Sequence, residues 1–296
     1  MDKMSEPSHL HPQIRFLLDQ STAERLEYVN LDRWINHAAC SSIRNKAKSL
    51  LFLPHSTQAT CFMIVGAGGT GKSSLLDRIS KDSESWSQRQ SIPPGHIVLK
   101  LSAEPTLANI IRALCEQFGI TAFNLRKDDI PAELMMLMRA RGIKVILIDE
   151  FNHLLTVNRV EQRKNLNFFK NLSGPPLSLN IIAFGTHEAL NAINLDTQLI
   201  SRFQIFELPQ WKPDEELRAF LASYEKFMPL RLPSNLASKE IVHFFSTTLE
   251  LTTRNIVNRL KWAAMLAIID GTEKIQIENL TIATSVPDLT GVYENE

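Results

Sequence analysis

The sequence has no excess of charge of either sign. Lys and Arg together number 32, and Asp and Glu also number 32, so the formal net charge is +0 at pH 7. This balance excludes a strongly basic coat for nucleic acid. It leaves room for a local basic stripe, because binding to phosphates depends on where the charges lie.

Long apolar runs are missing as well. No stretch approaches the ~20 apolar residues of a membrane span. The N-terminal segment MDKMSEPSHLHPQIRF has no apolar centre of the kind found in signal peptides. There is also no internal repeat and no low-complexity tract. We therefore expect a soluble, cytoplasmic protein that has no contact with a membrane.

Cysteine is scarce. The three cysteines, Cys40, Cys61 and Cys115, lie far apart and form no C-x-x-C pair that would indicate zinc or redox chemistry. We expect reduced and mostly buried thiols, as in other cytosolic proteins. The function is therefore sought in other side chains.

The sequence does contain a regular alternation of two patterns. Short apolar runs predict strands at 61–66, 96–101, 144–149, 180–186 and 203–208. Helical spacing between these runs predicts helices at 72–81, 106–118, 130–141, 161–172 and 188–193. Strands that alternate with helices predict an α/β fold with a parallel sheet covered on both faces.

The segments on either side of this alternation have a different character. Residues 14–53 carry helical signals that end at Pro54, and no strand pattern follows Pro209. We predict three parts, namely an N-terminal helical lead-in at 1–54, an α/β nucleotide-binding core at 55–209, and a small helical lid domain with a C-terminal tail at 210–296.

One glycine-rich stretch, GAGGTGKSS at 66–74, predicts a phosphate-binding loop. Its spacing fits G-x-x-x-x-G-K-[ST], in which glycines let backbone N–H groups surround phosphate oxygens without a Cβ clash. We expect Lys72 to reach the β- and γ-phosphates of ATP and the Ser73 hydroxyl to bind Mg²⁺. The predicted nucleotide contacts are Gly66, Ala67, Gly68, Gly69, Thr70, Gly71, Lys72, Ser73 and Ser74.

An acidic pair follows the third predicted strand in VILIDEFNHLL. Asp149 is expected at the carboxyl end of that strand, where α/β sheets bind ligands, so Asp149 is the second predicted Mg²⁺ residue besides Ser73. Glu150 follows at once, and a carboxylate there can polarise an attacking water. The pair favours hydrolysis over transfer to a small molecule. A strand that ends in a solvated acidic pair is the alternative.

Three further polar residues are candidates for the same reaction. Thr186 ends the run NIIAFGT and could sense the γ-phosphate, or it could make only a local hydrogen bond. Arg202 precedes the fifth strand and could act as an arginine finger in a neighbouring subunit, or it could be a surface residue. Arg254, in TTRNIV, could lean over the phosphates of its own subunit, or it could be an ordinary surface residue.

Taken together, these motifs resemble those of the AAA+ ATPases over about residues 14–284. The segments LLFLPHSTQATCFMIVGAGGTGKSSLL, ILIDEFNHLL, IIAFGTHEAL and LISRFQIFELPQW, with the N-terminal lead-in, look like the TniB/TnsC transposition ATPases. Two positions depart from the wider pattern. Thr186 stands where many AAA+ proteins carry Asn, and no clear G-x-x-R motif surrounds Arg254.

The resemblance implies an ATP-dependent regulator of DNA transposition. Such proteins assemble on duplex DNA in the ATP state, as rings or helical filaments. They receive a target-site signal from a TniQ/TnsD-like selector and recruit a DDE transposase of the TniA/TnsB type. ATP hydrolysis disassembles the complex. By this resemblance Lys72, Ser73, Asp149 and Glu150 have the roles given above, Thr186 is the first sensor, and Arg202 is the finger.

Other functions remain open from the sequence. The core is equally typical of a replication-initiator-like loader or a signalling NTPase, although 296 residues leave little room for a winged-helix domain or appended repeats. A module that binds ATP without hydrolysing it is a further alternative, against which Glu150 and Arg202 argue.

The neutral charge also constrains how DNA could be held. We expect a small set of basic side chains, repeated along an assembly, in place of a basic coat. The candidate segment is ITAFNLRKDD, in which Thr121, Arg126 and Lys127 could contact phosphates. Second choices are Arg139, Arg141 and Lys144. The alternative is a solvated loop with ordinary surface charges.

Overall fold

The computed structural model describes residues 7–53, 59–120 and 130–294. The chain divides into two compact units, one formed by Ala39–Pro209 and the other by Met1–Ala38 together with Gln210–Glu296. The three-part division that we predict from the sequence stays a prediction. In the structure, almost all of helix α2 (Ala38–Phe52) belongs to the unit that contains the sheet.

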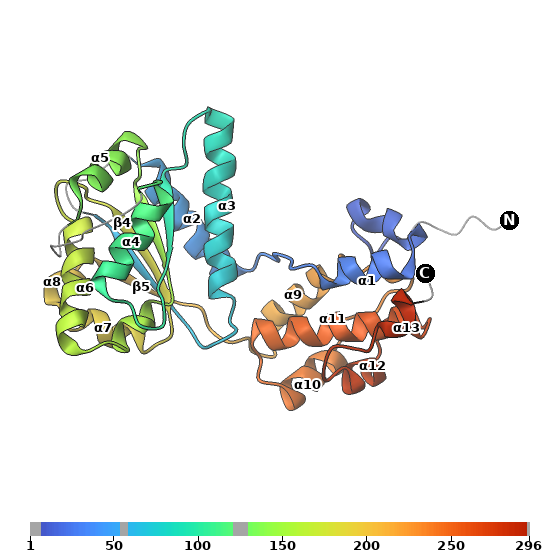
Figure 1. Ribbon diagram of the computed structural model, residues 1–296. Helices are drawn as coiled ribbons and strands as arrows, with labels where there is room; N and C mark the ends of the chain where they lie inside the picture. Colours follow the sequence, from blue (N-terminus) through green and yellow to red (C-terminus); the bar gives the residue numbers. More distant parts are fainter. Residues whose placement is uncertain (1–6, 54–58, 121–129, 295–296) are drawn as a thin grey trace. The chain divides into compact units, whose positions relative to one another are not determined.

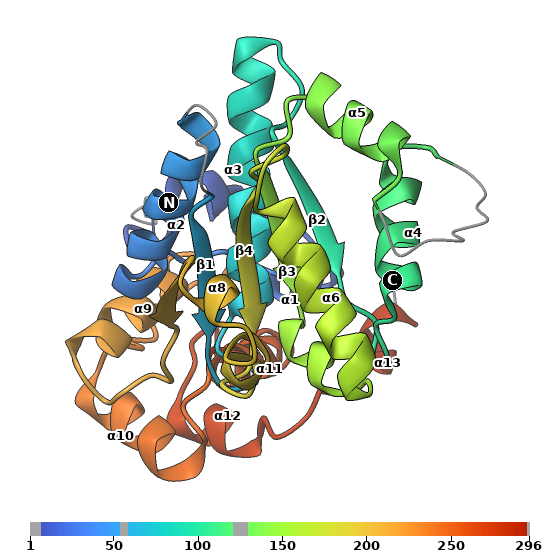
Figure 2. The same ribbon diagram turned by 90° about the vertical axis from the view of Figure 1, so that its left-hand side faces the viewer.

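The first unit is built on a five-stranded parallel sheet. Its strands are β1 (Cys61–Val65), β2 (His96–Lys100), β3 (Val145–Asp149), β4 (Asn180–Gly185) and β5 (Phe203–Glu207), in the order β2-β3-β4-β1-β5. All five predicted strands are confirmed to within a residue at each end. The sheet order places β1, β3 and β4 in the interior (Figure 2).

Burial explains why the sequence signals these strands so clearly. Every residue of β1 is buried, and so are the first four of β3, because helices cover both faces of the sheet. The edge strand β5 differs, since Gln204, Ile205 and Glu207 are exposed. A continuous apolar run in the sequence therefore corresponds to a strand in the interior of the sheet, such as β1 or β3.

Helices cover the sheet on both sides (Figures 1 and 2). One face lies under α2 and α3 (Lys72–Gln90). The other carries α4 (Leu107–Gln117), α5 (Ala132–Ala140), α6 (Arg159–Leu172) and α7 (Ala189–Ile193), packed in one apolar core with alternate residues of the strands. Two short elements, the 3-10 helix η2 (Phe151–Leu155) and α8 (Thr197–Ile200), complete the unit.

Helix α3 is longer than predicted. The sequence predicts a helix at 72–81, but α3 continues to Gln90. The buried side chains of its second half are small and polar. Ser83 and Ser87 are buried, and Ser80 and Ser83 bond the two ring nitrogens of His96 at 2.8 and 2.9 Å. Because serine gives no apolar periodicity, the hydrophobic pattern stops too early.

The second unit is helical. It contains η1 (Pro12–Asp19), α1 (Thr22–Asn30), α9 (Glu215–Glu225), α10 (Lys239–Thr248), α11 (Thr253–Ile269), α12 (Ile277–Ile282) and α13 (Thr290–Tyr293). Apolar residues of α1, α9, α10 and α11 share one core, which includes Leu26, Leu221, Phe245 and Leu260. The helical character predicted after Pro209 is therefore confirmed.

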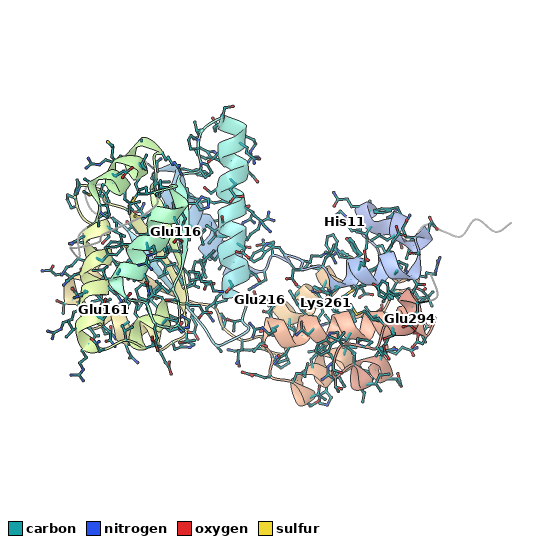
Figure 3. The ribbon with its side chains drawn as sticks, viewed as in Figure 1. His11, Glu116, Glu161, Glu216, Lys261 and Glu294 are labelled. Atoms are coloured by element: carbon teal, nitrogen blue, oxygen red, sulfur yellow. The ribbon has the colours of Figure 1, made fainter. Side chains whose placement is uncertain are left out.

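Two buried cations join the N-terminal helices of this unit to its C-terminal helices. Lys261 of α11, labelled in Figure 3, donates to the carbonyl of Asn30 at 2.7 Å and to the carboxylate of Asp32 at 2.9 Å. Arg25 of α1 donates to both carboxylate oxygens of Glu273 and to the carbonyl of Pro229. Buried charges need such partners, because an unpaired charge is costly to desolvate.

The three cysteines are free and buried, as predicted. Burial raises the pKa of the Cys61 thiol to about 11, so little of the reactive thiolate exists at neutral pH. Among the described residues, no helix combines the length and the apolar character that crossing a bilayer requires.

Candidate active site

The predicted phosphate-binding loop connects β1 to α3 at the carboxyl end of the sheet. Gly69 and Gly71 have φ angles of 78° and 99°, a region that glycine enters without strain. The Lys72 ammonium lies over the loop and donates to the carbonyls of Gly66 and Ala67 at 2.8 and 2.7 Å. Helix α3 begins directly after Gly71, which has no side chain to cap its first N–H groups.

Two glycines of the loop have different surroundings. A Cβ at Gly66 would meet the carbonyl oxygen of Leu208 at 2.5 Å and Oγ1 of Thr70 at 2.9 Å, so glycine is required there for the loop to close. At Gly68 an added Cβ would face open space. Thr70 is buried and donates to the Ala67 carbonyl at 3.0 Å, which holds the turn. Uncapped N–H groups at the start of a long helix attract anions.

Asp149 lies beside this loop. Its Oδ2 accepts a hydrogen bond from the Ser73 hydroxyl at 3.0 Å, and its Oδ1 accepts from the backbone N–H of Glu150 at 2.9 Å. The two predicted Mg²⁺ residues, 76 positions apart in the chain, are therefore in direct contact. Mg²⁺ typically binds one or two protein oxygens together with phosphate oxygens and water, and a hydroxyl next to a carboxylate suits that requirement.

Glu150 has an unusual backbone. Its φ is 56°, a left-handed conformation that costs a non-glycine residue about 1–3 kcal/mol. The carboxylate makes no hydrogen bond to any residue that the structure describes, whereas the backbone carbonyl accepts from His153 at 2.9 Å. Strain of this kind gathers at functional sites. The turn directs the chain away from the strand immediately after Asp149.

Thr186 follows β4, the neighbour of both β1 and β3 in the sheet. Its Oγ1 is buried and has no hydrogen-bond partner among the described residues, while its backbone N–H donates to Oδ1 of Asn152 at 3.2 Å. The loop is tied to the same strand tip, because Gly66 N–H donates to the Gly185 carbonyl at 3.3 Å. Asn152 was not among the predicted site residues, although it lies within the motif VILIDEFNHLL.

Arg202 lies at the other end of the sheet. It directly precedes β5, which runs parallel to β1, so it is at the amino ends of the strands, whereas the loop is at the carboxyl ends. Its guanidinium donates through Nη1 to the Ser173 hydroxyl at 2.7 Å and to the Lys170 carbonyl at 3.2 Å. Arg202 is half-buried and is not brought together with the loop of its own subunit.

A comparison with protein families gives one match, to the family described as "TniB: Bacterial TniB protein", over residues 25–213. This span is well over half of the chain and includes the loop, Asp149, Glu150, Thr186 and Arg202. The chain belongs to the TniB family. A comparison with curated proteins returns no significant match.

Several solved structures have the same fold as this TniB-family protein but low sequence identity to it. The Aeropyrum pernix ORC2 protein, in ADPNP-ADP complexes, is 18% identical, with a TM-score of 0.61, and the match covers 100% of this chain and 70% of that one. The Aeropyrum pernix ORC1 protein in complex with DNA is 15% identical, with a TM-score of 0.62 and coverage of 87% and 68%. AMPPCP-bound DnaA from Aquifex aeolicus is 17% identical, with a TM-score of 0.53 and coverage of 84% and 66%.

These likenesses show the fold. The TniB-family chain has the P-loop AAA+ architecture, with a parallel five-stranded sheet and helices on both faces, as the sequence predicts. At such low identities the neighbours' own ligands do not transfer to this chain. The family match and the fold together show a TniB-family protein with a P-loop AAA+ fold.

The remaining predicted residues belong to other segments of the chain. Arg254 is exposed in the first turn of α11, in the helical unit, and its role as a lid sensor stays a prediction. Thr121, Arg126 and Lys127 lie outside the described residues. Of the second choices, Arg139 and Lys144 donate to backbone carbonyls, and Arg141 also stacks on the Phe118 ring at 4.7 Å.

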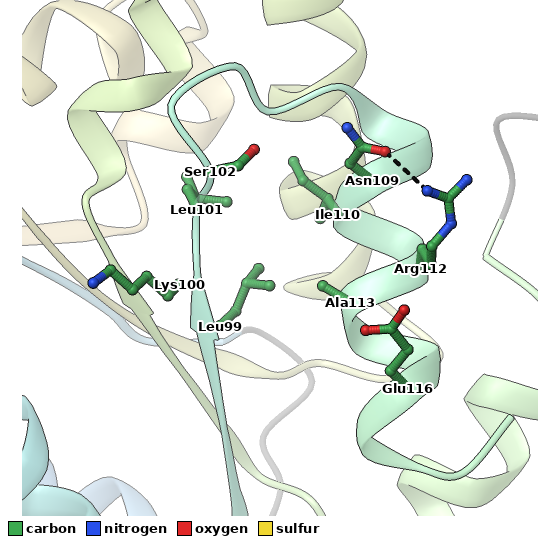
Figure 4. A pocket seen from close by; sticks show the side chains of 9 residues that line it. All are labelled: Leu99, Lys100, Leu101, Ser102, Asn109, Ile110, Arg112, Ala113 and Glu116. Atoms are coloured by element: carbon green, nitrogen blue, oxygen red, sulfur yellow. Dashed lines mark hydrogen bonds between the residues drawn. The ribbon is translucent and has the colours of Figure 1, made fainter. Parts of the chain in front are cut away.

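A separate hollow of about 210 Å³ lies between the end of β2 and helix α4 (Figure 4). Its floor is apolar, and at its rim Arg112 donates to Asn109 Oδ1 at 3.3 Å. None of residues 66–74 and neither Asp149 nor Glu150 lines it. The hollow is therefore distinct from the loop at which the candidate site is centred.

Proposed function

We propose that this TniB-family protein binds ATP with Mg²⁺ and hydrolyses it. The observation that carries the proposal is the hydrogen bond between Ser73 and Asp149, because it joins the end of the phosphate loop to the carboxyl end of β3. In this proposal the loop N–H groups and Lys72 hold the phosphates. Bound Mg²⁺ would neutralise charge on the β- and γ-phosphate oxygens, next to Ser73 and Asp149.

Glu150 is the proposed general base. It directly follows Asp149, and its carboxylate is not committed to any described protein donor. A carboxylate in that position can accept a proton from a water that attacks the γ-phosphate, which an amide cannot do. The strained backbone at φ 56° is consistent with a side chain held for a reaction. Thr186, whose buried hydroxyl has no partner among the residues that the structure describes, is the proposed sensor of the γ-phosphate.

We further propose that ATP binding drives assembly on duplex DNA. Arg202 supports this, because it lies at the opposite end of the sheet from the loop of its own subunit. An arginine so placed can complete the site of a neighbouring subunit in a ring or helical filament. A finger supplied in trans stabilises the charge of the transition state and couples turnover to assembly.

The biological role proposed is regulation of DNA transposition. Membership of the TniB family supports it. The ATP-bound assembly would link a TniQ/TnsD-like target selector to a DDE transposase of the TniA/TnsB type, and hydrolysis would release it from DNA. A replication-initiator-like loader is the second candidate, since the neighbouring folds include ORC and DnaA proteins.

Weak DNA contacts, summed along the assembly, would suit a chain with a net charge of +0. Thr121, Arg126 and Lys127 are the proposed contacts. Binding without base readout should be sequence-tolerant, with a log–log salt slope near 0.9 for each neutralised phosphate. Arg126→Ala with Lys127→Ala should lower that slope and leave nucleotide affinity unchanged. An unchanged slope would place the DNA site elsewhere.

Electron microscopy of the protein with duplex DNA and a non-hydrolysable ATP analogue tests the proposal as a whole. Rings or filaments on DNA, absent without the analogue, are expected. ATP turnover with and without DNA separates hydrolysis from simple binding. Absence of ATP-dependent DNA binding at low salt would discard the transposition role. Binding of ATP without any turnover would leave a non-hydrolysing module.

A further inference from the structure

Two polar groups at the carboxyl end of the sheet are held next to each other without a full set of partners. The Thr186 hydroxyl is buried and forms no hydrogen bond with any described residue. Its neighbour Asn152 accepts the Thr186 backbone N–H at Oδ1, at a distance of 3.2 Å. Buried polar groups are nearly always hydrogen-bonded, so an unpaired hydroxyl here requires an explanation.

The other end of the Asn152 amide is also available. Its Nδ2 donates to no residue within the described part of the chain. The accepted bond fixes which end of the amide is which, because a backbone N–H can be received only by the oxygen. The Asn152 amide therefore uses its oxygen for a bond within the protein, and both of its Nδ2 N–H donors are available to a bound ligand or water.

Packing fixes where this amide lies. A Cβ at Gly185 would meet Asn152 Oδ1 at 3.1 Å and Asn152 N at 3.3 Å, so the side chain lies closely against the tip of β4. The Gly185 carbonyl in turn accepts the N–H of Gly66, the first residue of the phosphate loop. Asn152 therefore lies two residues after Glu150 in the sequence. In space, it packs against Gly185, which is itself hydrogen-bonded to the phosphate loop.

We infer that Asn152 is a positioning residue for ATP hydrolysis, which rests on the proposed ATPase function. Its Nδ2 donates to the attacking water or to a γ-phosphate oxygen, while its Oδ1 holds the backbone of Thr186. A neutral amide suits this place, because it donates to anionic oxygens without competing with Glu150 for the proton.

Two substitutions separate a reaction role from a structural one. Asn152→Asp keeps an oxygen acceptor for the Thr186 N–H but removes the Nδ2 donors. Asn152→Ala removes both. Loss of one preorganised donor typically lowers kcat about 10²–10³-fold, so both variants should lose turnover at saturating ATP. A purely structural Asn152 would instead give a near-parental kcat for Asn152→Asp and a reduced one for Asn152→Ala.

The experiment measures kcat and KM for ATP in the presence of duplex DNA, with nucleotide affinity and thermal unfolding measured separately. Asn171→Asp, an exposed position on α6, is the matched control and should behave like the parent. Parental kcat in either Asn152 variant overturns the inference. If the parent itself shows no turnover, the proposed ATPase function fails first.

A second comparison, between a double variant and the single variant Asn152→Ala, tests the inference even if Asn152→Asp does not fold. Asn152→Ala with Thr186→Asn places an amide donor on the strand tip in place of the lost one. Partial recovery of kcat relative to Asn152→Ala alone supports a donor role at this point of the site. No recovery, in a double variant that binds nucleotide normally, contradicts it.

Discussion

The two ends of the same parallel sheet are built differently. At the carboxyl ends, the Glu150 carboxylate and the Thr186 hydroxyl lack protein partners among the described residues. At the amino ends, Arg202 and Asn180 both form side-chain hydrogen bonds, since Arg202 donates to Ser173 and Asn180 accepts the Thr60 N–H at 2.9 Å. The two groups without partners lie at the end of the sheet where the ligand is proposed to bind, whereas the hydrogen bonds of Arg202 and Asn180 connect neighbouring segments of the protein.

Arg202 gives the strongest test of this contrast, because it lies at the amino end of the sheet but is proposed to act in catalysis. Although it bonds α6 in its own subunit, we predict that it also completes a neighbouring site. Arg202→Ala should lower turnover about 10³–10⁵-fold. Mixing it with Glu150→Gln subunits, which are inactive but retain Arg202, should restore activity. No recovery in mixtures shown to co-assemble would make Arg202 a structural residue, like the rest of the amino end.

Glu150→Gln should give the next largest effect. The amide cannot accept the proton of an attacking water, so turnover should fall about 10²–10⁴-fold while ATP binding persists. The variant should also accumulate on DNA. Lys72→Ala is the contrasting change, because it should abolish nucleotide binding itself. Equilibrium binding and turnover, measured on both variants, check these outcomes. Hydrolysis by Glu150→Gln at the parental rate would mean that another residue positions the water.

At the amino end we expect the opposite pattern, with lower stability and unchanged chemistry. Asn180→Ala leaves the Thr60 N–H without its partner. The free energy of unfolding should fall by about 1–2 kcal/mol, with kcat unaffected. Urea unfolding together with an ATPase assay measures both quantities. Asn171→Ala, at an exposed helix position, should change stability by no more than about 0.5 kcal/mol. A large loss of kcat in Asn180→Ala would erase the contrast between the two ends.

The smallest predicted effect concerns pH. His96, buried at the start of β2, bonds Ser80 and Ser83, and burial lowers the pKa of its imidazole, an effect that Glu84 partly opposes. Because the folded-state pKa lies below the unfolded one, the neutral ring stabilises the fold above pH ~6.5. That contribution is lost as pH falls through the folded pKa. Between neutral and mildly acidic pH, the melting temperature of the unsubstituted protein should therefore fall more than that of the His96→Gln variant. Parallel curves would exclude His96 as the source.

Much of the fold could be predicted because its signals are local. The five interior and edge strands stand out as short apolar runs, and the phosphate loop is a contiguous motif with its own glycine chemistry. The second half of α3 could not be predicted in this way. Its buried contacts are made by Ser83 and Ser87, which give no apolar periodicity.

The candidate site shows the same division. Lys72, Ser73, Asp149 and Glu150 could be named from residue type and spacing. The approach of Ser73 to Asp149 depends on the order β2-β3-β4-β1-β5. In that order only β4 separates β3, which ends at Asp149, from β1, which leads into the loop before Ser73. The role inferred for Asn152 depends on its hydrogen bond to Thr186, 34 positions away. A hydrogen bond between residues so far apart in the chain leaves no pattern in the local sequence.

The sequence alone therefore determined which chemical groups are present and where strands and turns begin, since backbone preference and hydrophobic spacing act over a few residues. The tertiary structure alone decided which strand tips meet and which polar groups remain without partners. It also placed Arg202 at the far end of the sheet from Gly66. These properties follow from strand order and helix packing, in which each contact joins residues that are distant in the chain.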